Sequence, residues 1–116
     1  METSFYTGLI VEESLDDSRV LNDFKILKVE ITKEKNPADR WHMYTIEVSK
    51  KEIERISKEI KPKLWYANFW KDNELLVVFK NKIFTLDRYD TKTRKEAIEY
   101  GLAQGIPRKQ LDFKGD

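Results

Sequence analysis

The side chains best suited to acid–base or metal chemistry are few and scattered. His42 is the only histidine, so a metal site built on a histidine pair is excluded and few general bases remain. Glu12, Glu13, Asp16 and Asp17 could attract a divalent cation, but their spacing matches no calcium-binding loop. Solvated charges at the start of a short helix explain these four acids more simply.

Motifs for nucleophilic, phosphate or zinc chemistry are absent from the sequence. The chain has no cysteine and no G-x-S-x-G or H-E-x-x-H motif, and its 4 glycines are not grouped as a phosphate-binding loop requires. We therefore predict no catalytic residues, no metal and no cofactor, and we favour a protein that is not an enzyme.

The aromatic stretch LWYANFW is the strongest functional signal in the chain. Alternation along a strand divides it between two faces, which carry Leu64, Tyr66, Asn68 and Trp70 on one side and Trp65, Ala67 and Phe69 on the other. The first face is predicted to form the core beneath the helices. A buried Asn68 there needs a hydrogen-bond partner, which is either the backbone, Tyr44 or a ligand.

The opposite face is too apolar to be left in water, and this suggests an interface. Its predicted interface residues are Trp65, Phe69, Leu76 and Val78. Three covers remain open for it: the N-terminal segment 5–15, a second copy of the protein, or a ligand. The residues predicted to bind a ligand are Trp65, Tyr66, Asn68, Phe69 and His42.

Hydrophobic periodicity and end signals define the elements that must position these side chains. A strand or extended arm is expected over 6–15 and a short helix over 16–24, followed by strands over 24–34, 41–48, 64–70, 74–80 and 82–88. Helices are predicted to start at two capping boxes, Ser49 with Glu52 and Thr93 with Glu96. Leu27, Val29 and Ile31 should give the strand over 24–34 one buried face.

This order of elements predicts one α+β domain over residues 1–116. We expect a mostly antiparallel, twisted sheet of five or six strands with the two main helices on one face. A β-α-β unit followed by a hairpin favours a ferredoxin-like variant, although the extra strand before the last helix departs from that topology.

A second reading of the aromatic strands is a platform that stacks single-stranded RNA. Basic residues gather near one end of the predicted hairpins: Lys80, Lys82, Arg88, Lys92, Arg94 and Lys95. The glycine-containing RNP pattern is missing, and 22 basic residues against 21 acidic ones give a net charge of only +1. Nucleic acid is therefore a disfavoured partner that the sequence does not exclude.

Composition and apolar run lengths narrow the expected location. No apolar run approaches the ~18 residues of a membrane span, and the first residues lack the pattern of a signal peptide. The absence of cysteine suits a reducing compartment. We expect a cytoplasmic protein without a membrane partner.

Two stretches carry a resemblance to a known family. W-Y-A-x-F-W within residues 64–70 and G-I-P-x-x-Q-L-D-F near the C-terminus resemble a small family of uncharacterised bacterial and archaeal proteins of this length. The resemblance implies a stand-alone prokaryotic domain and supplies no catalytic or ligand residues. The favoured function is a non-enzymatic interaction or self-association domain, as a homodimer or with an unidentified protein partner; a small-molecule or nucleotide-binding module is the alternative.

Overall fold

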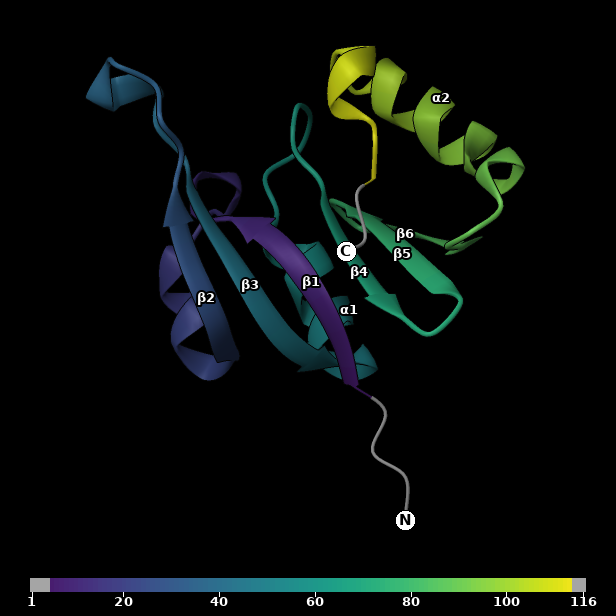
Figure 1. Ribbon diagram of the computed structural model, residues 1–116, viewed down its shortest axis with the longest axis horizontal. Helices are drawn as coiled ribbons and strands as arrows, with labels where there is room; N and C mark the ends of the chain where they lie inside the picture. The colour runs from purple at the N-terminus through teal and green to yellow at the C-terminus, as the bar shows by residue number, and fades with distance from the viewer. Residues whose placement is uncertain (1–4, 114–116) are drawn as a thin grey trace.

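The computed structural model describes residues 5–113, which form one open antiparallel sheet with helices on both sides. The strands lie in the order β2-β3-β1-β4-β5-β6 (Figure 1). Their bounds are β1 Phe5–Val11, β2 Lys25–Ile31, β3 His42–Ser49, β4 Ala67–Lys71, β5 Glu74–Phe79 and β6 Lys82–Asp87. The α+β prediction is confirmed. The N-terminal strand β1 lies inside the sheet between β3 and β4 and does not cover either face.

Two α-helices and five short 3₁₀ turns complete the described residues. The helices are α1 Lys50–Glu59 and α2 Lys95–Ala103, and the turns are η1 Glu12–Ser14, η2 Ser18–Asp23, η3 Pro37–Asp39, η4 Thr91–Arg94 and η5 Arg108–Gln110. In this part of the chain no helix is long and apolar enough to cross a membrane.

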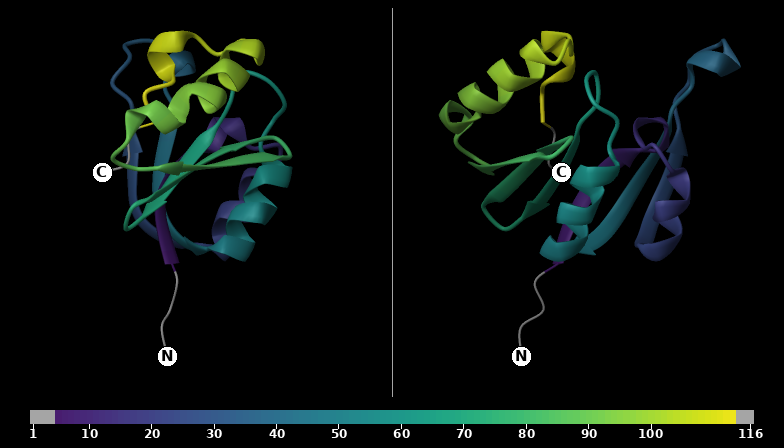
Figure 2. Two further views of the ribbon diagram at one scale, coloured as in Figure 1. Left: turned by 90° about the vertical axis from the view of Figure 1, so that its right-hand side faces the viewer. Right: turned by 180° about the vertical axis from the view of Figure 1, so that it is seen from behind.

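The prediction that both helices cover one face of the sheet is wrong. Helix α1 packs with Phe69, Leu76 and Val78, whereas α2 packs with Leu75 and Val77 on the other side of the same strands. Figure 2 shows the two helices on opposite sides of the sheet. Both faces of β4 and β5 are apolar, so each face must be covered, and each helix covers one of them.

The predicted interface is therefore part of the core. The side chains of Phe69, Leu76 and Val78 are fully buried beneath Ile53 and Ile56 of α1. Trp65, the fourth member of the predicted interface, precedes β4 and is half-buried against the edge of this core. None of the three occupants expected from sequence covers this face, because α1 of the same chain does.

Local signals at the two helix starts have opposite outcomes. The Ser49 hydroxyl accepts from the Glu52 N–H at 3.2 Å, and the Ser49 N–H donates to Glu52 Oε1 at 2.8 Å, so the first capping box is confirmed. The second is wrong, because α2 begins at Lys95 without a side-chain cap. Thr93 instead accepts from the Asp87 N–H at 3.1 Å and ties η4 to the end of β6.

Strand β2 departs most from its predicted environment. Its alternating apolar residues predict one buried face, yet all seven residues of β2 are exposed. Helix α1 packs over the middle of the sheet, and the short turn η2 lies behind β2 (Figure 1), yet every residue of this edge strand stays exposed.

Candidate functional site

A pocket of about 330 Å³ lies on the face of the sheet opposite α1. Its floor comes from three adjacent central strands and consists of Leu9 and Val11 of β1, Met43 of β3 and Asn68 of β4. One wall is formed by Trp41, Leu64, Trp65 and Tyr66, and the other by Lys109, Gln110 and Asp112. We call this cavity the tryptophan pocket.

The backbone before β4 is held in an unusual conformation at the pocket wall. Lys63 and Leu64 both have positive φ, 63° and 65°, in the left-handed region that costs residues with a side chain about 1–2 kcal/mol. The Leu64 N–H donates to the Gln104 carbonyl at 3.1 Å, at the end of α2. A Cβ on Gly105 (φ 88°) would lie 3.2 Å from Leu64 Cδ2, so the α2 terminus also packs against this turn.

Two indole rings meet at the rim of the pocket. The ring centroids of Trp41 and Trp65 are 5.5 Å apart, with the planes tilted by 58°. The backbone of Trp41 is fixed by Thr32, whose N–H donates to the Trp41 carbonyl at 3.0 Å and whose hydroxyl accepts from the Trp41 N–H at 2.8 Å. The two rings therefore present aromatic surface at a defined place beside the floor.

Tyr66 holds the C-terminal wall in place. Its hydroxyl donates a hydrogen bond to the Gln110 carbonyl, and its ring packs edge-on against Phe113 at 5.4 Å between centroids. Burial, helped by the nearby Asp112 carboxylate, raises the pKa of Tyr66 well above its usual range. Tyr66 is therefore a neutral donor that fixes the segment carrying the outer pocket residues.

Asn68 is the buried polar group of the floor. Its side chain is 6% exposed, and it lies between Leu9 and Val77 of the neighbouring strands. The partner considered from sequence, Tyr44, lies on the opposite face of the sheet, where its hydroxyl donates to Glu12 at 2.9 Å. The carboxamide of Asn68 supplies donor and acceptor chemistry to an otherwise apolar floor.

His42 lies on the other face of the sheet and does not join the tryptophan pocket. Its ring Nδ1 is 2.7 Å from Glu13 Oε2, and its backbone N–H donates to Glu13 Oε1 at 2.9 Å. The hydrogen bond to Glu13 raises the pKa of His42. Burial alone would raise the pKa of Glu13, but the hydrogen bonds from His42 outweigh it and lower that pKa.

This arrangement brings together three residues that the sequence separates. One donor atom from each of Glu12, Glu13 and His42 lies within 4.8 Å of the others, which is the spacing of a candidate cation site. The carboxylates already accept hydrogen bonds from Tyr44 and His42, so the cluster is explained as a hydrogen-bonded link between η1 and β3. We assign no metal to it.

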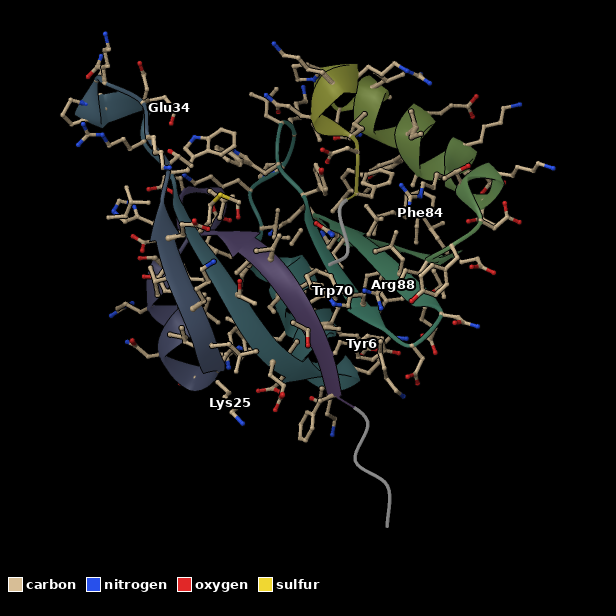
Figure 3. The ribbon with its side chains drawn as sticks, in the orientation of Figure 1. Tyr6, Lys25, Glu34, Trp70, Phe84 and Arg88 are labelled. Atoms are coloured by element: carbon tan, nitrogen blue, oxygen red, sulfur yellow. The ribbon has the colours of Figure 1, made fainter. Side chains whose placement is uncertain are left out.

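The predicted basic patch is largely engaged in contacts within the fold. The Arg88 guanidinium lies over the ring of Trp70, 5.9 Å from its centroid (Figure 3). It also lies 5.4 Å from the ring centroid of Tyr89. Arg94 donates to the carbonyls of Asp112 at 3.1 Å and Arg88 at 3.2 Å. Two of the four lysines of the patch also make contacts within the fold: Lys80 donates to the Lys58 carbonyl, and the Lys82 ammonium lies over the Phe84 ring. The other two, Lys92 and Lys95, border a hollow beside α2.

Three of the five predicted binding residues, Trp65, Tyr66 and Asn68, line the pocket. Phe69 and His42 point to the opposite face. Sequence reasoning missed the other wall and floor residues, because they come from segments far apart in the chain. The one available signal was the alternation of polar and apolar residues in Q-L-D-F, residues 110–113. Gln110 and Asp112 line the pocket, while Leu111 and Phe113 are buried in the core.

Comparison with models of known families, with curated proteins and with solved structures finds no match for this chain. The resemblance to an uncharacterised prokaryotic family stays a prediction.

Proposed function

We propose that the protein binds a small planar molecule in the tryptophan pocket. The observation that carries this proposal is the convergence of two indoles and a buried carboxamide on one preformed cavity. Its volume of about 330 Å³ falls at the lower end of the ~300–1,000 Å³ range of small-molecule sites. Such sites are mostly apolar and contain a few polar groups that orient the ligand.

The lining indicates the class of ligand. Trp41 and Trp65 offer ring faces for stacking. The Asn68 carboxamide, which already interacts within the fold, has further hydrogen-bonding capacity that the edge of a ligand can share. A neutral heteroaromatic ring with an amide-like edge meets both requirements. The base of a nucleotide is such a ring, but among the pocket side chains only Lys109 would meet its phosphates, so a base or nucleoside fits better than a nucleotide.

The test is a binding screen followed by a matched pair of variants. Nucleobases, nucleosides, indole and nicotinamide are screened by thermal shift, and hits are titrated by tryptophan fluorescence. Trp41→Ala removes a half-exposed stacking ring, and its loss should weaken binding by about 1–3 kcal/mol, or roughly 5- to 150-fold in Kd.

The control is Tyr89→Ala, which removes an exposed aromatic ring outside the pocket and should leave the Kd unchanged. A second pair compares Leu64→Ala at the rim with Leu102→Ala, which is exposed on α2. The proposal fails if no compound in the panel stabilises the protein, or if Trp41→Ala and Tyr89→Ala bind a hit equally well.

Three sequence-based expectations accompany this proposal. A cytoplasmic location is supported by the absence of cysteine. A ferredoxin-like relationship is supported by the connection β3-α1-β4, in which two strands of the same direction flank β1. A non-enzymatic role is supported by a pocket lined without histidine, serine or threonine, although it includes Lys109 and Asp112.

A further inference from the structure

The exposed edge strand β2 has a surface unusual for a sheet edge. Leu27, Val29 and Ile31 are 48%, 50% and 52% exposed, and within residues 5–113 no strand lies beyond them in the sheet. Natural edges are usually protected by short strands, proline, charged side chains or a bulge, because an open apolar edge recruits another strand. Strand β2 has seven residues and no proline, and its bulge between Ile26 and Lys28 leaves the stretch from Lys28 to Ile31 regular.

The backbone of β2 presents its free groups in a regular order. The Thr32 N–H donates to the Trp41 carbonyl, so the backbone of Thr32 faces β3. Because successive residues of a strand point their N–H and C=O groups to opposite sides, Glu30 and Lys28 also face β3. The N–H and C=O groups of Ile31 and Val29 then face outward from the sheet, while the bulge at Leu27 interrupts this alternation.

Side chains divide cleanly between the two faces of this strand. Val29 and Ile31 pair with Tyr44 and His42 and share their face, and the bulge before Lys28 brings Leu27 to the same side. The charged residues Lys28 and Glu30 lie on the opposite face, with Lys28 Nζ 3.7 Å from Glu30 Oε1. One face of the edge is therefore apolar, while the other carries one charge of each sign.

We propose that β2 pairs antiparallel with β2 of a second copy of this chain, about a two-fold axis at Val29. In this register Val29 meets the Val29 of the partner subunit, and Leu27 meets Ile31 on the apolar face. On the other face, Lys28 of each copy lies opposite Glu30 of its partner. The outward N–H and C=O groups of Val29 meet those of Val29 of the partner subunit.

The other registers available to two identical strands are less favourable. Opposite residues of an antiparallel pair share a face, so the axis must pass through a residue position. An axis at Lys28 or at Glu30 would set like charges against each other. An axis at Leu27 would set Lys28 against Ile26. Only the Val29 axis matches apolar with apolar residues and opposite charges with each other, and this self-complementarity identifies a second copy as the occupant.

The opposite end of the sheet does not offer an equivalent edge. At β6 the Asp87 N–H is bound by the Thr93 hydroxyl of η4, so this edge is partly closed. Pairing through β2 alone uses the same surface on both copies and produces a closed dimer with a continuous sheet, not a filament.

The oligomeric state tests this pairing directly. Sedimentation equilibrium from about 1 µM to about 500 µM should show twice the mass of the chain at the high end. Lys28→Glu and Glu30→Lys each convert both charged pairs to like pairs and should weaken the dimer about tenfold. Lys51→Glu, a reversal at an exposed position on α1, is the matched control and should leave the dimer unchanged.

Mixing separates self-pairing from capture of another protein. Each reversed chain repels its own copy, but Lys28→Glu and Glu30→Lys chains complement each other, so their equimolar mixture should regain dimer of wild-type strength. The double variant, which swaps the two charges, should also recover.

Val29→Pro removes an outward N–H without breaking a hydrogen bond between β2 and β3, so it should abolish the dimer. At low concentration the Val29→Pro protein should have the same Tm as the wild-type monomer. A wild-type chain that stays monomeric throughout overturns the proposal, as does a dimer that survives Val29→Pro and both reversals.

Discussion

The contact between Gly8 and Phe69 allows the buried face of the sheet to be tested with one added methyl group. Gly8 of β1 lies directly opposite Phe69 of β4, and a Cβ built on Gly8 would lie 2.0 Å from Phe69 Cδ2 and 2.5 Å from Cε2. Carbon atoms normally approach to about 3.5–4.0 Å, so the ring would have to move by about 1.5 Å.

Phe69 has no free space for that movement. Its side chain is fully buried, and its neighbours Leu76 and Val78 are fully buried with it. Overpacking of a dense core costs about 1–3 kcal/mol and sometimes more. We expect Gly8→Ala to lower the free energy of unfolding by about 3 kcal/mol, which corresponds to a decrease in Tm of about 10–15 °C for a chain of this size.

The assay is thermal and urea unfolding of the variant beside a matched glycine substitution. A Cβ on Gly101 of α2 would lie 2.6 Å from Leu111 Cδ2, but a methyl at the end of a flexible side chain can move. Alanine also favours a helix over glycine by about 1 kcal/mol, so Gly101→Ala should stay within about 1 kcal/mol of the wild type.

A double-mutant cycle with Phe69→Ala identifies the cause. Alanine removes Cγ, Cδ2 and Cε2 of Phe69, the atoms that collide, so adding Gly8→Ala to this background should cost less than about 1 kcal/mol. If Gly8→Ala lowers the free energy of unfolding of the otherwise wild-type chain by less than about 1 kcal/mol, the reasoning is refuted. Such a small cost would mean that the Phe69 ring can move aside and is not held in a dense core. An undiminished cost in the Phe69→Ala background would assign the effect to the backbone of β1.

Two further predictions concern titration and backbone strain. The hydrogen bond to Glu13 should place the pKa of His42 above the ordinary ~6.5, and Glu13→Gln should return it towards that value in an NMR titration of this single imidazole. Because the pKa of His42 is raised in the folded state, protonated His42 stabilises the fold fully below its unfolded-state pKa, and this stabilisation is lost as pH rises through its folded-state pKa. Glu13→Gln should therefore lower the free energy of unfolding more at low pH than at high pH, and a larger loss at high pH would contradict this. Lys63→Gly should raise the free energy of unfolding by about 0.5–1 kcal/mol in urea, since glycine adopts positive φ without strain. The control Lys61→Gly, where φ is not positive, should destabilise, and equal effects at both sites would argue against strain at Lys63.

Local features of this protein could be predicted from the sequence because they depend on neighbours within a few residues. The Ser49–Glu52 box begins α1, and the alternation of Ile46 and Val48 marks the buried face of β3. Alternation also showed that both faces of the hairpin strands are apolar. These features follow from side-chain periodicity and from backbone groups that need partners nearby.

The tertiary structure decided which surface covers which. Apolar residues recur at every second position in both β2 and β4, yet Phe69 is buried and Val29 is half exposed, because α1 packs over the centre of the sheet and not over its edge. The tryptophan pocket depends on the same long-range order. With β1 between β3 and β4, Met43 and Asn68 line the same floor from either side of Leu9 and Val11. His42, the neighbour of Met43 along β3, faces the other way. Periodicity identifies an apolar face, but only chain packing determines whether a helix, a ligand or a second copy lies against it.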